Sequence, residues 1–383
     1  NGSKIRILNL IKQIQSTHQV TLLTLTPEEI DRARQEEIGR FCARVHVLVV
    51  PKYAPKNTRA LVGLFSAMPR SLYATTSLEA DRTIRQLAAA SDLVVLSELG
   101  MLPYVFCADD RPVILDDPEL GTIRDRMVNT PSVKERVRHA LTWYKLSRFL
   151  RRALRRVMAC TVVSDGERMH LQRAAPWYRR IRVVPNCLDL KEYASAYGSP
   201  RPDTLIFSGA LTYSANLQAV QWFLEKVWAS VLVHAPHARF VVTGAFNHAQ
   251  MSVLRQHRGV EFAGYLPDVR PAIAESWISV VPLQTGAGTR LKILEAMALG
   301  TPVVSTTKGA EGLAVTPERD ILIADSPADF AAQTMRLLRS SALRAELAQN
   351  GRQLVRAKYD WDRAGAQFRD LIVEVVQGQF ADG

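Results

Sequence analysis

Residues 281–305 read VPLQTGAGTRLKILEAMALGTPVVS, and this stretch decides the predicted fold. An apolar run is followed by a loop with two glycines, a helix-forming segment, a glycine stop and a second apolar run. Short apolar strands joined through a helix in this way form parallel sheets that are covered on both faces. Gly286 and Gly288 have no Cβ, so the loop backbone can approach a ligand closely. Gly300 marks the expected end of the helix.

The same stretch predicts an anion site at the start of that helix. The backbone amides of Gly288, Thr289 and Arg290 are expected to point outward without helical partners. Arg290 and Lys292 add positive charge, and the Glu295 carboxylate can accept hydrogen bonds from a pair of sugar hydroxyls. Phosphate, cations and a ribose-binding carboxylate together describe a nucleotide diphosphate. On spacing alone, an ordinary strand–loop–helix unit with solvated Arg290 and Lys292 stays open, because such glycine loops are common.

Strands and helices alternate along almost the whole chain. We expect strands at 20–25, 45–50, 93–96, 113–115, 159–163, 181–184, 204–207, 239–242, 260–262, 278–281, 302–305 and 321–323. Two prolines and a glycine within residues 197–203 favour an extended linker. The predicted fold class is therefore α/β, with two Rossmann-like doubly wound parallel-sheet domains that face a cleft. The predicted domains are 1–190 and 200–357, and the segment 358–383 follows them.

Composition supports a folded, two-domain protein. The chain has 383 residues, of which 47% are hydrophobic, so a sizeable core is expected and wholesale disorder is excluded. Cys42, Cys107, Cys160 and Cys187 are scattered without a CxxC pair, which is typical of thiols in a reducing compartment. Neither an Asp-x-Asp motif nor a Cys/His ligand pattern indicates a metal. We find no apolar run long enough to span a membrane and expect a cytoplasmic protein.

The positive charge is concentrated in the first half of the chain. Residues 1–190 hold 30 Lys and Arg against 19 Asp and Glu, whereas residues 191–383 hold 19 against 18. Between Lys134 and Arg156 there are nine basic residues and one acid, Glu135. An apolar side is expected from Trp143, Tyr144, Leu146, Phe149 and Leu150. This pattern predicts a basic amphipathic helix near an anionic membrane surface or a phosphorylated acceptor, and a solvated face stays open. Nucleic acid is not favoured, because no recognition motif accompanies the charge.

Residues 295–304, EAMALGTPVV, resemble the donor-binding helix of the family-4 glycosyltransferases, which have the two-domain GT-B fold. The family motif has two glutamates separated by seven residues, and the second of them corresponds to Glu295. The resemblance implies that Glu295 binds the donor ribose and that Gly288, Thr289 and Leu291 line the donor site. The position of the first glutamate holds Ala287. A subgroup with Gly-x-Gly-Thr-Arg-Leu-Lys also lacks that glutamate.

Other blocks resemble the same family. Residues 207–216, FSGALTYSAN, are similar to the first strand and turn of the donor domain, where Gly209 would let the diphosphate approach and Asn216 is expected as a helix N-cap. Many relatives place an Arg and a Lys after this strand; neither occurs here, and Arg290 and Lys292 are the expected substitutes. Two further blocks imply donor contacts by Gly264, Tyr265 and Leu266 at the base and by Glu311 in the loop 308–312. Residues 184–189 and 359–361 resemble the domain junction and the segment that crosses back to the first domain.

The first domain is expected to bind the acceptor. Residues 1–10 resemble the family's first glycine loop and helix without the strand that usually precedes them, so the chain is expected to be truncated there. Gly2 lines the cleft or belongs to a frayed terminus. Acceptor-side or catalytic carboxylates are expected after two strands, namely Glu98, Asp116, Asp117 and Glu119. Relatives have a histidine where this chain has Pro118, and Glu119 is the expected replacement.

Helix capping is the alternative for these carboxylates. Residues 164–167, SDGE, also resemble a family motif, but a capping box is the preferred interpretation.

The predicted function is transfer of a sugar from a nucleotide-diphosphate sugar to a glycan or lipid-linked acceptor. The resemblance implies retention of configuration without a metal or other cofactor, with Arg290 and Lys292 stabilising the leaving group. Two alternatives stay open. One is another GT-B enzyme, such as a nucleotide-sugar epimerase or a phosphorylase. The other is a non-catalytic nucleotide-sugar-binding protein. The base, the sugar and the acceptor are not specified by the sequence.

Overall fold

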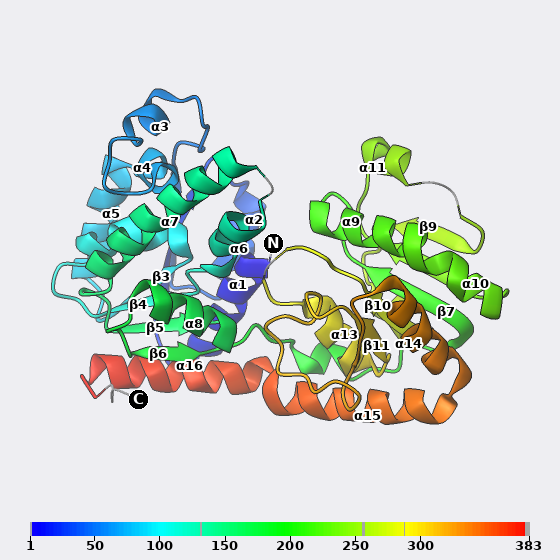
Figure 1. Cartoon of the computed structure of the whole chain (residues 1–383). Helices are drawn as coiled ribbons and strands as arrows, with labels where there is room; N and C mark the ends of the chain where they lie inside the picture. Colours follow the sequence, from blue (N-terminus) through cyan, green and yellow to red (C-terminus); the bar gives the residue numbers. More distant parts are fainter. Residues whose placement is uncertain (1, 131, 255–256, 287, 380–383) are drawn as a thin grey trace. The chain divides into compact units, whose positions relative to one another are not determined.

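The computed structural model describes residues 2–130, 132–254, 257–286 and 288–379. It divides into two compact units (Figure 1). Unit 1 comprises Asn1–Pro185 and Asp362–Gly383, and unit 2 comprises Asn186–Trp361. Both units are α/β with parallel sheets, which confirms the predicted fold class.

Unit 2 is built on a six-stranded parallel sheet in the order β12-β11-β10-β7-β8-β9. The strands are β7 (Arg201–Ser208), β8 (Arg239–Thr243), β9 (Val260–Gly264), β10 (Ser276–Val281), β11 (Val303–Ser305) and β12 (Leu322–Ile323). From β7 the chain moves outward through β8 to β9, then returns to the other side of β7 for β10 and continues outward. The sheet is therefore doubly wound, with its switch point between β7 and β10.

The helices of unit 2 cover this sheet. They are α9 (Ser214–Phe223), α10 (Ala229–His234), α11 (His248–Val253), α12 (Arg270–Ala274), α13 (Leu291–Leu299), α14 (Pro327–Arg339) and α15 (Ser341–Lys358), with a 3₁₀ turn η2 (Leu190–Tyr193). A π-helical turn η3 (Leu224–Trp228) lies between α9 and α10. Buried aromatic rings pack between the sheet and these helices; Phe223 lies 4.7 Å from Phe240 and 5.8 Å from Phe330, centroid to centroid.

Unit 1 contains two separate parallel sheets. One pairs β1 (Thr21–Thr26) with β2 (Arg44–Val49), and the other has the order β3 (Val94–Ser97), β4 (Val113–Asp116), β5 (Ala159–Val162), β6 (Ile181–Val183). A cavity of about 830 Å³ is lined by residues of α1 (Gly2–Ile14), β1, β3 and α16 (Trp361–Val376). The remaining elements are α2 (Arg32–Gly39), α3 (Thr58–Val62), α4 (Arg70–Thr75), α5 (Leu78–Ala89), the 3₁₀ segment η1 (Leu99–Cys107), α6 (Gly121–Asn129), α7 (Val133–Ala153) and α8 (Asp165–Ala174).

The long basic helix α7 is partly a core element. Leu146 and Leu150 are buried in a cluster with residues of η1 and of the four-stranded sheet β3-β4-β5-β6. Trp143 and Phe149 pack against that cluster. The apolar side that the sequence assigned to a membrane surface is therefore largely used by the fold, and of those residues only Tyr144 is exposed.

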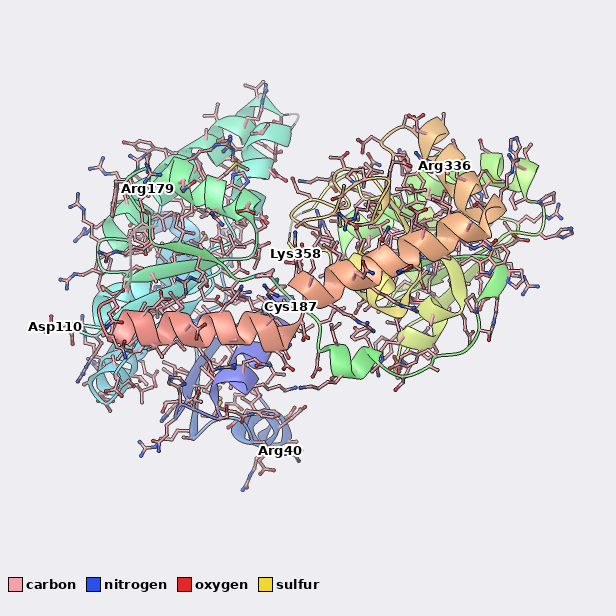
Figure 2. The ribbon with its side chains drawn as sticks, turned by 90° about the horizontal axis from the view of Figure 1, so that it is seen from below. Arg40, Asp110, Arg179, Cys187, Arg336 and Lys358 are labelled. Carbon is pink, nitrogen blue, oxygen red and sulfur yellow. The ribbon has the colours of Figure 1, made fainter. Side chains whose placement is uncertain are left out.

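Two long helices end the chain. Figure 2 shows α16 lying along unit 1, where Glu374 forms an ion pair with Arg182, and α15 lying along unit 2. Leu188 forms a bridge to Asp360, and the thiol of Cys187 lies 4.0 Å from the carbonyl oxygen of Lys358. All four cysteines are free thiols, as the sequence predicts.

Candidate functional site

The carboxyl ends of β7 and β10 lie side by side at the switch point of the unit 2 sheet. Gly209 follows β7 directly, and residues 282–290 connect β10 to α13. In open parallel sheets this is the position at which ligands bind, because the connecting loops diverge there and leave a crevice. The topology thus places the predicted donor residues Gly209, Arg290, Lys292 and Glu295 at one end of one sheet.

The glycine loop has the backbone that the sequence predicts. Gly286 and Gly288 have φ of 100° and 89°, which residues with a Cβ rarely adopt. A Cβ on Gly286 would lie 3.1 Å from the hydroxyl of Tyr213. Ala287, which stands at the position of the family's first glutamate, lies outside the described residues.

Helix α13 begins at Leu291, two residues later than expected. The Leu291 amide donates to the carbonyl oxygen of Thr289 at 3.0 Å, and the Ile293 amide donates to that of Arg290 at 2.9 Å. The Thr289 hydroxyl accepts from Nδ2 of Asn186 at 2.9 Å. The loop is thus held by its own turn and by Asn186, which lies in the segment that resembles the family's domain junction. Because the Leu291 amide is already bonded to Thr289, the donor contact predicted for Leu291 would use its other atoms.

Lys292 is enclosed in a cage of three residues. Its Nζ donates to Oδ1 of Asn216 at 2.8 Å and lies 4.0 Å from the centroid of the Phe207 ring. A Cβ on Gly209, which has φ of 149°, would approach that Nζ to 2.7 Å and Nδ2 of Asn216 to 2.8 Å, so a larger residue there would displace the ammonium. Asn216 lies within α9 and also donates to Ala210, so the N-cap interpretation is wrong.

The environment of Lys292 is unfavourable for its charge. Burial, together with the nearby Arg290 guanidinium, lowers the pKa of Lys292 to about 7, against a partial opposing effect of Glu295. Part of the side chain is accessible, but its ammonium end is deep enough for desolvation to dominate. The contacts with Asn216 and Phe207 disfavour a freely solvated ammonium, the alternative left open by the sequence. An anion placed here would restore the charged form.

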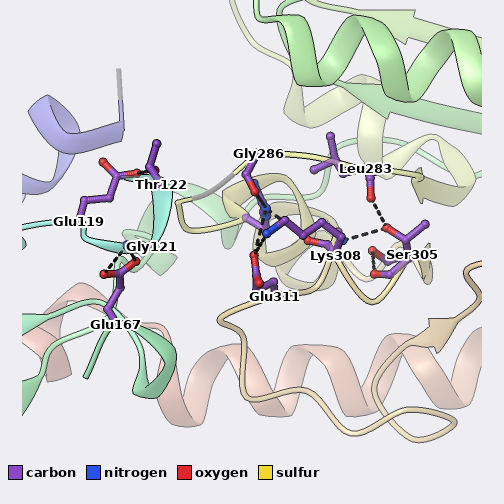
Figure 3. A network of polar contacts seen from close by, with 12 residues as sticks. Glu119, Gly121, Thr122, Glu167, Leu283, Gly286, Ser305, Lys308 and Glu311 are labelled. Carbon is purple, nitrogen blue, oxygen red and sulfur yellow. Dashed lines mark hydrogen bonds and ion pairs between the residues drawn. The ribbon is translucent and has the colours of Figure 1, made fainter. Parts of the chain in front are cut away.

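Arg290 is buried as well, with only 5% of its surface exposed. Its Nη2 donates to the carbonyl oxygens of Gly286 at 2.7 Å and Lys308 at 3.3 Å, and lies 3.8 Å from Oε2 of Glu311. Figure 3 shows Lys308 and Glu311 in the same network, where they form an ion pair of 2.6 Å. Arg290 therefore joins the glycine loop to the loop after β11, and the predicted donor residue Glu311 lies within reach of both cations.

Glu295 lies one turn beyond Lys292 on α13. The Tyr193 hydroxyl donates to its Oε1 at 3.3 Å, and the Arg270 guanidinium lies 5.8 Å from the centroid of the Tyr193 ring. Burial raises the pKa of Glu295, although Tyr193, Lys292 and Arg270 oppose this. The ribose contact predicted for Glu295 would use its other carboxylate oxygen and stays a prediction.

The residues predicted to read the base lie at the end of β9. Gly264 has φ of 74°, and its carbonyl oxygen accepts from the amide of Gly244 at 2.7 Å. Tyr265 is 72% exposed, and Leu266 is half-buried. Their contact with a base stays a prediction.

The predicted catalytic residue Asp116 ends β4 in unit 1 and is fully buried. Arg6 of α1 forms an ion pair with it at 2.7 Å, and the Thr161 hydroxyl donates to Oδ1. Arg6 also donates to the carbonyl oxygen of Val184 at 2.8 Å. These contacts make Asp116 a structural partner of Arg6 within unit 1. Gly2 begins the same helix, α1.

Three acidic residues near Asp116 have strained backbones. Glu98, Asp117 and Glu119 have φ of 72°, 48° and 42°, a region that few non-glycine residues occupy. Within the described chain, Oδ1 of Asp117 is buried without a hydrogen-bond partner. Burial, and more weakly the surrounding carboxylates, raise the pKa of Asp117 to about 7 against the lowering effect of Arg6. Strain of this kind gathers at functional sites, so these three remain acceptor-side candidates.

Side-chain capping by these carboxylates is not seen among the described residues: Glu98 stands at the N-cap position of η1 without a side-chain hydrogen bond, and at the start of α6 Glu167 takes that place. Its carboxylate accepts from the amides of Leu120 at 2.8 Å and Gly121 at 3.0 Å, at the start of α6 (Figure 3). Ser164 caps α8 by accepting from the Glu167 amide, so only half of the predicted capping box is formed. Glu119 accepts from the Thr122 hydroxyl at 3.1 Å.

Sequence reasoning missed Arg6, Tyr193 and the role of Asn216. Arg6 stands between Ile5 and Ile7 in α1, a signal that could have indicated a buried ion pair. Tyr193 is 102 residues from Glu295 in the sequence, and no local pattern links them.

The comparisons concern mainly unit 2. Residues 202–340 match the family model for Glycosyl transferases group 1. The matched segment includes the whole switch-point cluster from Gly209 to Glu311.

Two curated relatives match part of the chain. An uncharacterized 44.6 kDa protein in the cps region of Klebsiella pneumoniae is 24% identical over 164 residues, 41% of this chain. The GDP-mannose-dependent monoacylated alpha-(1-6)-phosphatidylinositol monomannoside mannosyltransferase of Corynebacterium glutamicum is 26% identical over 163 residues, 39% of this chain. The matched part spans 42% of the length of each relative.

Solved structures resemble the whole chain. The HepE protein of Anabaena, in complex with UDP and glucose, has a TM-score of 0.68 at 12% identity and covers 97% of this chain and 96% of its own. Sucrose-phosphate synthase from Thermosynechococcus elongatus has a TM-score of 0.70 at 16% identity, covering 99% and 94%. The segment that matches the group 1 model thus belongs to a chain with the GT-B fold, as the sequence predicts.

None of the described helices combines the length and apolarity needed to cross a bilayer. Among the same residues, no three His, Cys, Asp or Glu side chains gather as metal ligands.

Proposed function

We propose that the protein is a glycosyltransferase that moves a sugar from a nucleotide-diphosphate sugar to a glycan or lipid-linked acceptor. One observation carries the proposal: Gly209, Arg290, Lys292 and Glu295 gather at the switch point of the unit 2 sheet. The lysine there is held in an environment that disfavours its charge. Such a site favours a ligand that brings negative charge, and the neighbouring carboxylate suits a sugar diol. HepE, whose structure holds UDP and glucose, is consistent with this donor class.

The proposed reaction is metal-independent and retains configuration. The bond from the anomeric carbon to the diphosphate oxygen breaks while an acceptor hydroxyl attacks the same carbon from the same face. The acceptor proton passes to the departing diphosphate oxygen. Lys292 and Arg290 stabilise the charge that develops on that oxygen, Lys292 by direct contact and Arg290 also by fixing both loops.

The acceptor is proposed to bind at the strand ends of unit 1. Gly2, Glu98, Asp117 and Glu119 are the candidates, and the strained backbone of the three acids supports them. The ion pair with Arg6 favours a supporting role for Asp116 over the catalytic one. A lipid-linked acceptor would bring the protein to the cytoplasmic face of an anionic membrane.

Donor binding is tested by thermal shift and calorimetry with UDP-, GDP-, ADP- and dTDP-sugars. One of them should raise the melting temperature in wild type and raise it less in Lys292→Met. If none binds, the donor assignment is wrong. Incubation with the bound donor then separates the rivals, since an epimerase converts it without an acceptor and a phosphorylase requires inorganic phosphate. Binding without turnover over a broad acceptor panel would favour a non-catalytic protein.

A further inference from the structure

The first turns of α7 carry an exposed apolar stripe. Val133, Val137, Leu141 and Tyr144 are each at least 55% exposed. Their spacing of four, four and three residues places them along one side of the helix. The stripe lies ahead of Leu146 on α7, where the helix begins to enter the core of unit 1. Four large apolar side chains in one row are therefore left in solvent by the fold.

A second exposed apolar group lies beside this stripe. Leu61 and Val62 at the end of α3, with Leu64 and Phe65 directly after it, are all exposed, and Phe65 reaches 94%. Nζ of Lys145 on α7 donates to the carbonyl oxygen of Leu64 at 2.5 Å. Figure 1 shows α3 and α7 in the same part of unit 1. The α3 turn thus contacts α7 next to Tyr144, the last residue of the stripe, and the stripe and this turn are together called the α3–α7 surface.

Basic residues surround the α3–α7 surface. Lys134, Arg136, Arg138, Lys145 and Arg148 lie along the same part of α7. The single acid, Glu135, falls on the far side of the helix from the stripe, and its carboxylate pairs with Arg138 at 3.4 Å. Of these described basic residues, only Arg138 is paired with this acid, so the surface presents apolar side chains together with an excess of positive charge.

We propose that the α3–α7 surface docks on an anionic lipid bilayer, with the apolar residues entering the interface and the basic residues contacting lipid headgroups. A helix with an exposed apolar stripe and flanking Lys and Arg is typical of interfacial binding. Nucleic acid would use the charge but leave eight apolar side chains in water. The proposed docking surface uses the first part of the basic segment 134–156, because the apolar residues of α7 beyond Tyr144 pack in the core of unit 1. It does not depend on donor binding in unit 2.

The test is co-sedimentation of the full chain with two kinds of vesicle, phosphatidylcholine alone and phosphatidylcholine mixed with phosphatidylglycerol. Binding is expected only to the anionic vesicles and should weaken as salt is added. The apolar variant Phe65→Ser/Val137→Ser/Leu141→Ser and the basic variant Lys134→Gln/Arg136→Gln/Arg138→Gln should each bind at least tenfold more weakly. All these side chains are exposed, so both variants should keep the wild-type melting temperature.

The matched control is Lys226→Gln/Val233→Ser, which removes an exposed cation and an exposed apolar residue from unit 2 and should bind as wild type. Equal binding to neutral and anionic vesicles, no binding to either, or undiminished binding by both variants would overturn the proposal. The proposal would also be overturned if the protein bound duplex nucleic acid but not vesicles, and if the apolar variant bound the nucleic acid as strongly as wild type. The donor titration is read separately, so loss of vesicle binding would leave the proposed donor site intact.

Discussion

Both units bury charged side chains at the carboxyl ends of their parallel strands, but the charges are balanced in unit 1 and not in unit 2. At the strand ends of unit 1, Arg6 and Asp116 neutralise each other in an ion pair of 2.7 Å with both side chains 1% exposed. At the strand ends of unit 2, two cations, Arg290 and Lys292, lie near each other, and the pKa of Lys292 falls to about 7. A matched pair needs no ligand, whereas excess positive charge in a buried place favours an anionic one. The contrast distinguishes a structural charge pair from the proposed binding site.

The largest expected effect comes from breaking the matched pair. Asp116→Asn leaves the Arg6 guanidinium buried without its counter-ion and should lower the free energy of unfolding by about 3–5 kcal/mol in denaturant titration. The double variant Arg6→Met/Asp116→Leu should recover most of the loss. The exposed pair Arg85–Asp109 is the control, since Asp109→Asn should cost less than about 1 kcal/mol. A small loss for Asp116→Asn would contradict the structural role.

Removing a cation from unit 2 should change turnover more than stability. Arg290→Ala should lower kcat roughly a hundredfold, because the developing charge on the leaving diphosphate loses a stabilising group. Steady-state kinetics with the donor identified by thermal shift measures this, and the melting temperature monitors the loops that Arg290 joins. A change confined to KM would exclude leaving-group stabilisation.

Glu295→Ala should weaken donor binding at least tenfold, about 1.4 kcal/mol, by calorimetry. The carboxylate loses its hydrogen bonds to the proposed ribose, while the cationic cluster remains. Tyr193→Phe should have a smaller effect in the same direction, because it removes only the hydroxyl that orients Glu295. The exposed Glu318→Gln is the control. Unchanged affinity in Glu295→Ala would end the ribose assignment.

The smallest expected effect is the uptake of a fraction of a proton when the donor binds. Because the pKa of Lys292 is about 7 in the free protein, the side chain is mostly neutral at pH 8–9. A bound diphosphate favours the ammonium form and raises this pKa, so binding should take up a proton and weaken as pH rises above 7. Calorimetry in buffers of different ionisation enthalpy measures the uptake. Lys292→Met should bind without it, and equal uptake by both proteins would assign the proton elsewhere.

Much of unit 2 could be predicted from residues that are close in sequence. The strand–loop–helix pattern of 281–305 requires glycines at two positive-φ positions, and the structure places them there. The sequence predicts that the amides of residues 288–290 open α13, whereas the helix begins at Leu291. A turn between Thr289 and Leu291 precedes it, and residue types alone do not separate this turn from the first helical turn. Local pattern could not reveal that Asn216 holds Lys292 instead of capping α9, because that contact joins residues 76 positions apart.

The sequence by itself determined the alternation of strands and helices, the concentration of positive charge in the first half and the chemistry of the glycine loop, because periodicity and residue type are local properties. Only the tertiary structure decided which charges are paired. The ion pair of Arg6 with Asp116, the cage around Lys292 and the exposed stripe on α7 depend on which surfaces the chain buries. The free energy of a buried charge depends on the groups that surround it in space, and the sequence neighbours of a residue do not determine which groups these are.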